Sequence, residues 1–435
     1  MKLNRTVASP VFTHEGGKAT RINAEAELRR TVMACMLWED TFYEDGVSVA
    51  NRIASLIPLV SPARVAAIAI EARSKMNLRH VPLLLCRELA RNGTLKADTL
   101  AEVIQRPDEL TEFLAIYWAG GKQPLSAQVK KGLAKAFTKF DAYALGKYNR
   151  DAPIKLRDVL FLSHAKPKQA AQAEVWKQLV DGTLASPDTW EVALSGGADK
   201  GEVFTRLIME RKLGALALLR NLRNMEQSGV DRGLVREALA EADVRRVLPF
   251  RFIAAARHAP QFEPALEAAL FRSLEDAPKL AGRTVLLIDV SISMDAQLSA
   301  KSEMDRLDAA CGLAMVAREI CEDVEVHTFS NVGVLVPPRR GFALRDAIVS
   351  SQPHGGTYLA GAVKAINGRT EYDRIIVVTD EQSQDGIVSP LPASKAYILN
   401  VASYQNGVGY GRWTHIDGFS EACVKYIVAL EATPG

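Results

Sequence analysis

Residues 283–293 have the sequence RTVLLIDVSIS, and this stretch decides the fold class of the C-terminal third of the chain. Its continuous apolar run, rich in β-branched residues, is typical of a parallel strand that is buried on both faces. Similar runs occur at 325–330, 374–380 and 396–402, and the segments 306–322, 343–351 and 358–368 between them have helical spacing. Alternating strands and helices predict a doubly wound α/β domain with a mainly parallel sheet.

Oxygen-bearing side chains follow two of these strands and open one of the helices. In doubly wound domains, ligands bind beyond the carboxyl ends of the strands, so we expect these side chains to face a common point. Oxygen-only ligands, of which two are carboxylates, suit a hard divalent cation, and Mg²⁺ is the ion we expect. The residues of this predicted metal site are Asp289, Ser291, Ser293, Thr357 and Asp380.

Upstream of this domain, from about residue 25 to residue 275, the sequence is helical nearly throughout. Apolar residues recur at three- and four-residue spacing in 24–38, 62–76, 80–92 and 97–105, with short breaks between them. Many helices of ten to fifteen residues joined by short turns predict antiparallel pairs stacked as a solenoid. We therefore predict two domains, a helical-repeat domain at 1–280 and an α/β domain at 281–435.

Composition restricts the class of protein. The chain has 435 residues, 48% hydrophobic and 24% charged, which is ordinary for a globular protein. It has no apolar run of the roughly 18 residues needed to span a bilayer, and residues 1–20 lack the apolar segment of a signal peptide. Its five cysteines form no CxxC pair, which argues against disulfides and zinc. We expect a cytoplasmic protein with no membrane partner.

The net charge of +3 conceals an uneven distribution. Residues 1–280 hold 41 basic and 33 acidic residues, whereas residues 281–435 hold 13 and 18. The window 122–168 alone holds 11 basic residues against 3 acidic ones. A basic stretch of this kind indicates a polyanionic partner and gives its approximate location.

Within this window, residues 127–148 have an apolar stripe of Val129, Leu133, Ala136, Phe140 and Tyr143, which we expect to be buried. Three lysines step by four beside it, and Arg157, Phe161 and His164 share one face of the next helix, with Leu156, Val159, Leu160 and Ser163 facing inward. Such a surface binds RNA or DNA with salt-dependent affinity; a solvated lysine face and a structural His164 are the alternatives. The predicted RNA-binding residues are Lys130, Lys131, Lys135, Lys139, Lys147, Arg150, Arg157, His164 and Lys166.

Two resemblances support these expectations. The DxSxS, Thr357 and Asp380 pattern resembles the metal-ion-dependent adhesion site of von Willebrand factor A domains, which usually bind proteins and do not usually catalyse. The stretches 130–168, 217–225 and 247–252 resemble the TROVE module of the Ro 60-kDa autoantigen family, and this chain resembles a short member, such as a bacterial one.

That resemblance implies a ring of HEAT-like helical repeats whose two ends are held together by the A domain. It implies that the outer surface binds small structured noncoding RNAs (Y RNAs and their relatives) and that the central hole takes single-stranded ends of misfolded or processed RNA. Further implied partners are an exoribonuclease such as polynucleotide phosphorylase, tethered through RNA. An acidic protein ligand is expected at the metal site.

The resemblance also assigns individual positions. Lys147 and Arg150 match the basic positions of a TKYxxR-like turn, and Arg157 and His164 match those of a [KR]DxLxLSH helix. Phe161 stands where many relatives carry another basic residue. One contact of the small-RNA site is therefore either absent or replaced by stacking of Phe161 on a base. Two other functions remain open: a metal-dependent protein-docking module without a dedicated RNA, and a metal-dependent ribonuclease. No catalytic residue is predicted, because the chain has no G-x-S-x-G elbow, HExxH motif or P-loop.

Overall fold

The computed structural model describes residues 10–33, 46–195, 197–245, 247, 249–298, 304–402, 404, 406–418 and 422–432. They form two compact units. The helical unit comprises Ala50–Glu241, and the sheet unit combines Met1–Val49 with Ala242–Gly435. The division into compact units differs from a division at residue 280, because the residues before Ala50 and those from Ala242 onward form one unit with the sheet. The domain boundary at residue 280 stays a prediction.

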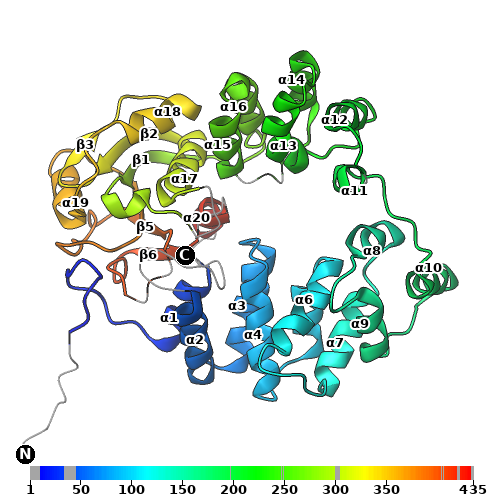
Figure 1. Ribbon diagram of the computed structural model, residues 1–435. Helices are drawn as coiled ribbons and strands as arrows, with labels where there is room; N and C mark the ends of the chain where they lie inside the picture. The colour runs from blue at the N-terminus through cyan, green and yellow to red at the C-terminus, as the bar shows by residue number, and fades with distance from the viewer. Residues whose placement is uncertain are drawn as a thin grey trace, which may run out of the picture. The chain divides into compact units, whose positions relative to one another are not determined.

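The helical unit is built from helices that pack against their near neighbours in the chain. Apolar residues at helical spacing explain this packing: in one helix Val81, Leu85 and Leu89 are all buried at four-residue intervals. Figure 1 shows α3 to α9 following one another, in agreement with the contacts of α3 with α4 and of α5 with α7. The helices are α3 (Pro62–Ser74), α4 (His80–Arg91), α5 (Ala97–Val103), α6 (Pro107–Tyr117), α7 (Ala127–Phe137), α8 (Ala142–Tyr148), α9 (Leu156–Ser163), α10 (Ala170–Asp181), α11 (Trp190–Ser195), α12 (Lys200–Met209), α13 (Ala215–Gln227) and α14 (Arg232–Glu241); α2 (Gly46–Leu56) and the 3-10 turn η1 (Ile57–Leu59) precede them.

One helical prediction needs correction. The stretch 127–148 is two helices, because α7 ends at Phe137 and Asp141 starts α8 by accepting a hydrogen bond from the Ala144 amide, 2.8 Å away. The expected burial of Phe140 is confirmed, but Tyr143 is 57% exposed. The break changes the direction of the helix, so Tyr143 no longer continues the apolar stripe of α7.

The sheet unit contains a six-stranded sheet in the order β3-β2-β1-β4-β5-β6. All neighbouring strands are parallel except β2 and β3, which confirms the predicted doubly wound α/β fold. The pattern did not predict the short edge strands β3 and β6. The elements are β1 (Leu280–Asp289), η3 (Ile292–Asp295), α17 (Arg306–Ile320), β2 (Cys321–Phe329), β3 (Gly333–Leu335), α18 (Gly341–Val349), α19 (Leu359–Asn367), β4 (Arg374–Thr379), β5 (Lys395–Asn400), β6 (Thr414–Asp417) and α20 (Ala422–Ala432).

Helices cover both faces of this sheet, which explains why its central strands are apolar throughout. Val285 and Leu287 pack with Leu359 and Val363 of α19 in one buried cluster. The alternate residue Leu286 points to the other face, where α17 contacts β1 and α20 contacts α17. Figure 1 shows α19 on one side of the strands and α17 and α20 on the other.

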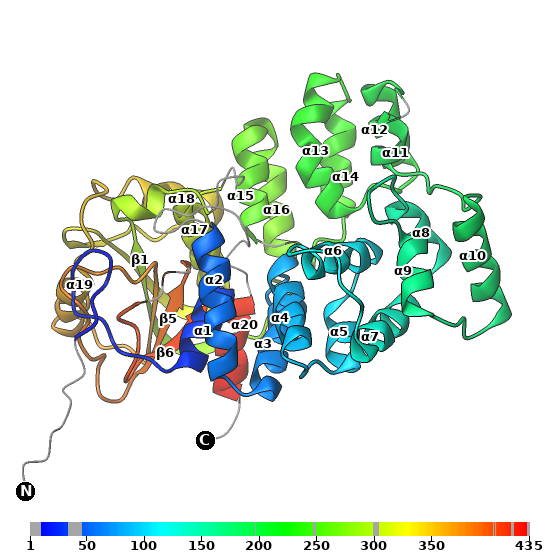
Figure 2. The same ribbon diagram turned by 60° about the horizontal axis from the view of Figure 1, so that its bottom comes forward.

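Three helices outside the predicted α/β domain belong to the sheet unit. These are α1 (Ala24–Met33), α15 (Pro249–His258) and α16 (Glu263–Arg272), with the 3-10 turn η2 (Pro260–Phe262) between the last two. Helix α1 contacts β6, beside which it lies in Figure 2. The predicted helix 24–38 extends past Met33 into residues outside the described part. No described helix is long and apolar enough to cross a membrane.

Candidate functional site

The predicted metal-site residues lie at the switch point of the sheet, where the chain turns to opposite sides. Strand β1 ends at Asp289 and its parallel neighbour β4 ends at Thr379, so the loops that follow both strands meet at the same edge. The Ile292 amide donates a hydrogen bond to the Gly355 carbonyl oxygen at 3.0 Å. This bond joins the DVSIS loop to the loop that contains Thr357. The Gln384 amide in turn donates to the Thr357 carbonyl oxygen at 2.8 Å, which joins the loop after β4.

Side-chain hydrogen bonds order this cluster. Asp289 accepts from the Ser291 amide through Oδ1 at 2.9 Å and from the Thr379 hydroxyl through Oδ2 at 2.5 Å. The hydroxyl oxygens of Ser291 and Ser293 lie 3.3 Å apart. All five predicted metal ligands are buried, none being more than 3% exposed. The three loops therefore bring the predicted oxygen donors into one buried cluster.

The two carboxylates of this cluster have different electrostatic surroundings. Asp380 Oδ2 lies 3.1 Å from Nη1 of Arg306, the first residue of α17, which is itself buried. Asp289 forms no ion pair with a basic side chain among the described residues. Burial, together with the nearby charge of Asp380, raises the pKa of Asp289 to about 7. The ionised form of Asp289 thus lacks a compensating positive charge.

These residues fit a divalent cation. A buried carboxylate without a cationic neighbour gains most from a bound metal ion, and hydroxyl and carboxylate oxygens are the donors that Mg²⁺ prefers. Among the described residues no group of three or more His, Cys, Asp or Glu side chains forms a metal-binding cluster. The cluster of two carboxylates and three hydroxyls therefore differs from the carboxylate-rich, two-metal sites of many nucleases.

Sequence reasoning missed a buried ionic network directly beside the metal-site loop. Glu381 follows Asp380, has a left-handed backbone (φ 62°) and pairs with Arg30 of α1. Its carboxylate also lies 2.8 Å from Nε2 of His415, and His415 Nδ1 lies 3.3 Å from Asp417. Burial lowers the pKa of His415 despite these carboxylates. Arg30 lies 351 positions before Glu381, so no local pattern could have indicated the pairing.

The N-terminal segment holds the same loop through further contacts. The Thr13 hydroxyl donates to the Ser383 carbonyl oxygen at 2.9 Å, and the His14 amide donates to the side-chain oxygen of Gln382 at 2.7 Å. A Cβ on Gly17 would lie 2.0 Å from that same Ser383 oxygen, so only glycine fits this approach. Residues 380–383 are thus fixed by the N-terminal segment on one side and by the Thr357 loop on the other.

His354, which lies close in sequence to the metal loop, has a local structural role. Its Nδ1 lies 2.8 Å from Asp295 Oδ1, and its Nε2 lies 3.0 Å from the Val349 carbonyl oxygen. Both ring nitrogens therefore have partners within the neighbouring loops. The position of His354 in its loop is explained without any part in metal binding.

The predicted RNA-binding lysines on α7 and in the turn after it fall into two groups. Lys135 pairs with Asp98 at 2.7 Å, and Lys139 donates to the carbonyl oxygens of Ala101 and Ile104 at the end of α5. Burial lowers the pKa of Lys139. Lys131 and Lys135 lie on α7, but α7 ends at Phe137 and Lys139 follows it in a turn, so the three lysines do not share one helix. Lys135 and Lys139 are both held by intramolecular partners.

A second set of predicted residues forms no salt bridge in the described part of the chain; Lys130 is half-buried and the others are exposed. The inward-facing residues of α9 are buried as predicted, while Phe161 is 59% exposed. His164 follows α9 in a left-handed conformation (φ 53°) that ends the helix. The residues without an acidic partner are Lys130, Lys131, Arg157, His164 and Lys166.

Three cations gather around one aromatic ring. Lys147 Nζ and the guanidinium carbon of Arg150 each lie 5.9 Å from the centre of the Tyr148 ring. The guanidinium of Arg106, at the start of α6, lies 4.9 Å from it. Lys147 and Arg150 were predicted, whereas Arg106 and Tyr148 were not, because these two residues are 42 positions apart in the sequence. This Tyr148 cluster combines positive charge with an aromatic ring, the combination that binds unpaired nucleotides.

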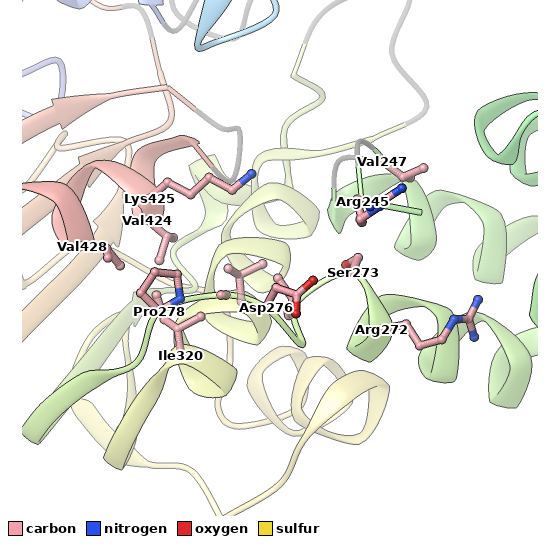
Figure 3. A pocket seen from close by; sticks show the side chains of 13 residues that line it. Arg245, Val247, Arg272, Ser273, Asp276, Pro278, Ile320, Val424, Lys425 and Val428 are labelled. Atoms are coloured by element: carbon pink, nitrogen blue, oxygen red, sulfur yellow. The ribbon is translucent and has the colours of Figure 1, made fainter. Parts of the chain in front are cut away.

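A separate cavity of about 460 Å³ lies in the sheet unit. In Figure 3, Val424 and Val428 of α20 point toward Pro278 and Ile320, while Arg272 points away from this apolar group. None of the predicted metal or RNA-binding residues lines the cavity. Its lining comprises Arg245, Val247, Arg272, Ser273, Leu274, Asp276, Ala277, Pro278, Val316, Ile320, Val424, Lys425 and Val428.

Helices followed by a doubly wound domain with an adhesion-type oxygen cluster define a class of modular binding proteins. Comparison with known proteins identifies the family. The family model of the TROVE domain matches residues 182–280, and that of the Ro60 vWA domain matches residues 283–402. The two matches together span just over half of the chain and follow each other directly. The chain therefore belongs to the Ro 60-kDa family.

A solved structure supports the same fold. The crystal structure of the Ro (RSR) protein of Deinococcus radiodurans is 20% identical and aligns with a TM-score of 0.59. The alignment covers 94% of this chain and 99% of that protein. All five metal-site residues lie within the matched Ro60 vWA range, whereas the predicted RNA-binding residues precede the matched TROVE range. The family assignment thus supports RNA binding in general but does not test those residues individually.

Proposed function

We propose that this protein is an RNA-binding scaffold without catalytic activity, acting in the cytoplasm. The observation that carries this proposal is the set of exposed basic side chains without acidic partners on α7 and α9, together with the Tyr148 cluster. Unpaired cations release counterions from phosphates when they bind, and exposed aromatic rings stack on unpaired bases. Phe161 and His164 at the end of α9 supply such surfaces next to Arg157.

The RNA that this surface suits best is a small structured noncoding RNA of the Y type. Its duplex regions supply phosphates for the lysines and its loops supply unpaired bases for Phe161 and Tyr148. We further propose that the family's second activity applies here, namely the capture of single-stranded ends of misfolded or processed RNA for quality control or maturation. In this function an exoribonuclease such as polynucleotide phosphorylase is tethered through the RNA.

The metal-site cluster has a separate role in this proposal. We infer that Asp289, Ser291, Ser293, Thr357 and Asp380 hold Mg²⁺ and that an acidic side chain of a protein ligand completes the coordination. The predicted α/β domain, residues 281–435, takes no direct part in binding RNA in this proposal, since it carries 18 acidic against 13 basic residues. In this proposal, protein docking and RNA binding thus involve different parts of the chain.

The experiment is crosslinking and sequencing of RNA that co-purifies from the native host. The test variant replaces Lys131, Arg157, His164 and Lys166 with alanine. A matched control replaces Lys135, Arg206 and Lys212, which also removes three cations from the helical unit but only ones that have acidic partners. We expect one or two small structured RNAs with the wild type and the control, and their loss with the test variant.

Two other outcomes would change the function. Background RNA, equal in all three proteins, would favour the alternative that the chain is a metal-dependent protein-docking module without a dedicated RNA. Cleavage of labelled RNA with Mg²⁺, abolished by Asp289→Ala, would show a ribonuclease. We expect no cleavage, because the cluster offers only two carboxylates.

A further inference from the structure

Arg306 places a permanent positive charge inside the metal-site cluster. Its Nη1 lies 3.1 Å from Asp380 Oδ2 and 3.3 Å from the carbonyl oxygen of Ser293, and the residue is only 2% exposed. Arginine remains protonated at any physiological pH, so this charge cannot be removed by titration. No metal-site pattern in the sequence had pointed to Arg306, which lies 13 positions beyond Ser293.

The charges of the cluster have a direct consequence. Asp289, Asp380 and Arg306 together carry a net charge of −1 when both acids are ionised. A bound divalent cation changes this to +1, and the cation must share the Asp380 carboxylate with Arg306. Without Arg306 the same cluster would hold −2 and become neutral when the metal binds. Arg306 therefore both weakens the attraction for a metal ion and leaves the loaded site positive.

We propose that Arg306 competes with the metal ion for Asp380 and thereby couples metal binding to the binding of a carboxylate ligand. The inference rests on the metal site proposed above and adds a regulating residue to it. A carboxylate neutralises the residual positive charge, so it binds best to the metal-loaded site. By thermodynamic linkage, the metal then binds more tightly when the carboxylate is present. The site takes up its metal together with the acidic side chain of its protein ligand.

The experiment measures Mn²⁺ affinity of the intact chain by the electron paramagnetic resonance of free Mn²⁺. Titrations run at equal ionic strength in chloride and in acetate, with acetate as the carboxylate probe. Asp289→Ala protein lacks a central residue of the proposed site. It therefore measures how far acetate lowers the concentration of free Mn²⁺ by complexing the ion in solution. For the wild type we expect weak binding in chloride and tighter binding in acetate.

Arg306→Gln tests the residue itself. We expect its Mn²⁺ affinity in chloride to rise roughly tenfold or more, the size of effect that a charge within about 4–6 Å exerts on an ionisation. The acetate effect should shrink, because the loaded site is then neutral. Arg306→Lys, which keeps the charge, should stay close to the wild type. The matched control is Arg257→Gln. It removes a cation whose Nη2 lies 2.6 Å from Oδ1 of Asp308, in the first turn of α17. This substitution should change the Mn²⁺ affinity little.

Different failures have different meanings. Equal Mn²⁺ affinity in the wild type and Arg306→Gln would overturn the competition. No acetate effect in the wild type would overturn the coupling, and this result does not depend on whether any variant folds. Absence of Mn²⁺ binding from every protein would overturn the proposed metal site and the present inference with it. None of these results bears on RNA binding by the helical unit.

Discussion

Lys131 of α7 and Lys139, in the turn that follows α7, illustrate how far a single residue's role depends on its partners. Lys131 is exposed without an acidic partner in the described part of the chain, whereas Lys139 donates to the carbonyl oxygens of Ala101 and Ile104. A cation at these carbonyls satisfies orphan acceptors and opposes the negative end of the dipole of α5. Sequence spacing predicted one helical ridge through both residues, but the helix ends between them. Spacing also could not distinguish a lysine that faces solvent from one that binds carbonyl oxygens at a helix end.

We expect these two lysines to separate RNA binding from stability. Lys139→Ala should lower the free energy of unfolding by about 1–2 kcal/mol, because the carbonyls at the end of α5 lose their donor. Lys131→Ala should leave stability unchanged and lower the slope of log affinity for RNA against log salt by about 0.7–0.9, the loss of one phosphate contact. Urea denaturation and filter binding at several salt concentrations measure the two effects. Loss of stability in Lys131→Ala and a lower salt slope in Lys139→Ala would contradict this assignment.

At the scale of elements, one carboxylate links α20 to two strands of the sheet, in addition to the packing of its buried apolar residues. Glu431 pairs with Arg374 of β4 and Lys395 of β5, and it accepts a hydrogen bond from the Tyr397 hydroxyl at 3.0 Å. Burial alone would raise the pKa of Glu431, but the hydrogen bonds from Arg374 and Lys395 outweigh it and lower the pKa to about 2. Helix α20 therefore depends on the ionised form of Glu431.

This dependence predicts a change with pH. The folded pKa lies below the unfolded value of about 4.3, so the stabilisation is fully present above that value and is lost as the pH falls through about 2. Glu431→Gln should cost about 2–3 kcal/mol near neutral pH. The difference from the wild type should narrow between pH 4 and pH 2. Chemical denaturation across this range measures it, and a constant difference would show that packing, not the charge, holds α20.

Helix α1 makes the second long-range ionic contact at this scale. Arg30 and Glu381 are both fully buried, and removing one partner leaves the other charge without compensation. Arg30→Ala should therefore cost roughly 3–5 kcal/mol, and Glu381→Ala should add little to it in the double variant. Full additivity of the two substitutions in thermal denaturation would contradict a direct pairing.

The strength of sequence patterns explains which elements were predictable. The central strands and α17 to α19 are long or fully buried, so their apolar runs are unambiguous. Strands β3 and β6 have three and four residues and lie at the edges, where burial imposes little pattern. The grouping of the five predicted metal-site residues could be predicted because they lie at strand ends or in loops whose position at one sheet edge follows from the topology. Arg306 and Arg30 were not, because their partners are distant in the chain.

At the scale of the whole molecule, the grouping into two units predicts how the chain unfolds. Each unit has its own buried core, so we expect two cooperative transitions in calorimetry. Arg30→Ala and Glu431→Gln should lower the same transition, because both residues belong to the sheet unit. Lys139→Ala should lower the other. A single transition shifted by all three variants would show that the units unfold together.

The contact between α1 and the loop after β4 also sets an order of events during synthesis. Arg30 emerges from the ribosome 351 residues before Glu381, and at about 5–20 residues per second the interval is roughly 20–70 s. The helical unit, which is continuous in sequence, can fold during that time. During this interval Arg30, which is buried in the folded protein, is without the carboxylate of Glu381. The sheet unit can therefore be completed only after nearly the whole chain has been translated, which makes an interrupted translation product recognisable by its unburied N-terminal helix.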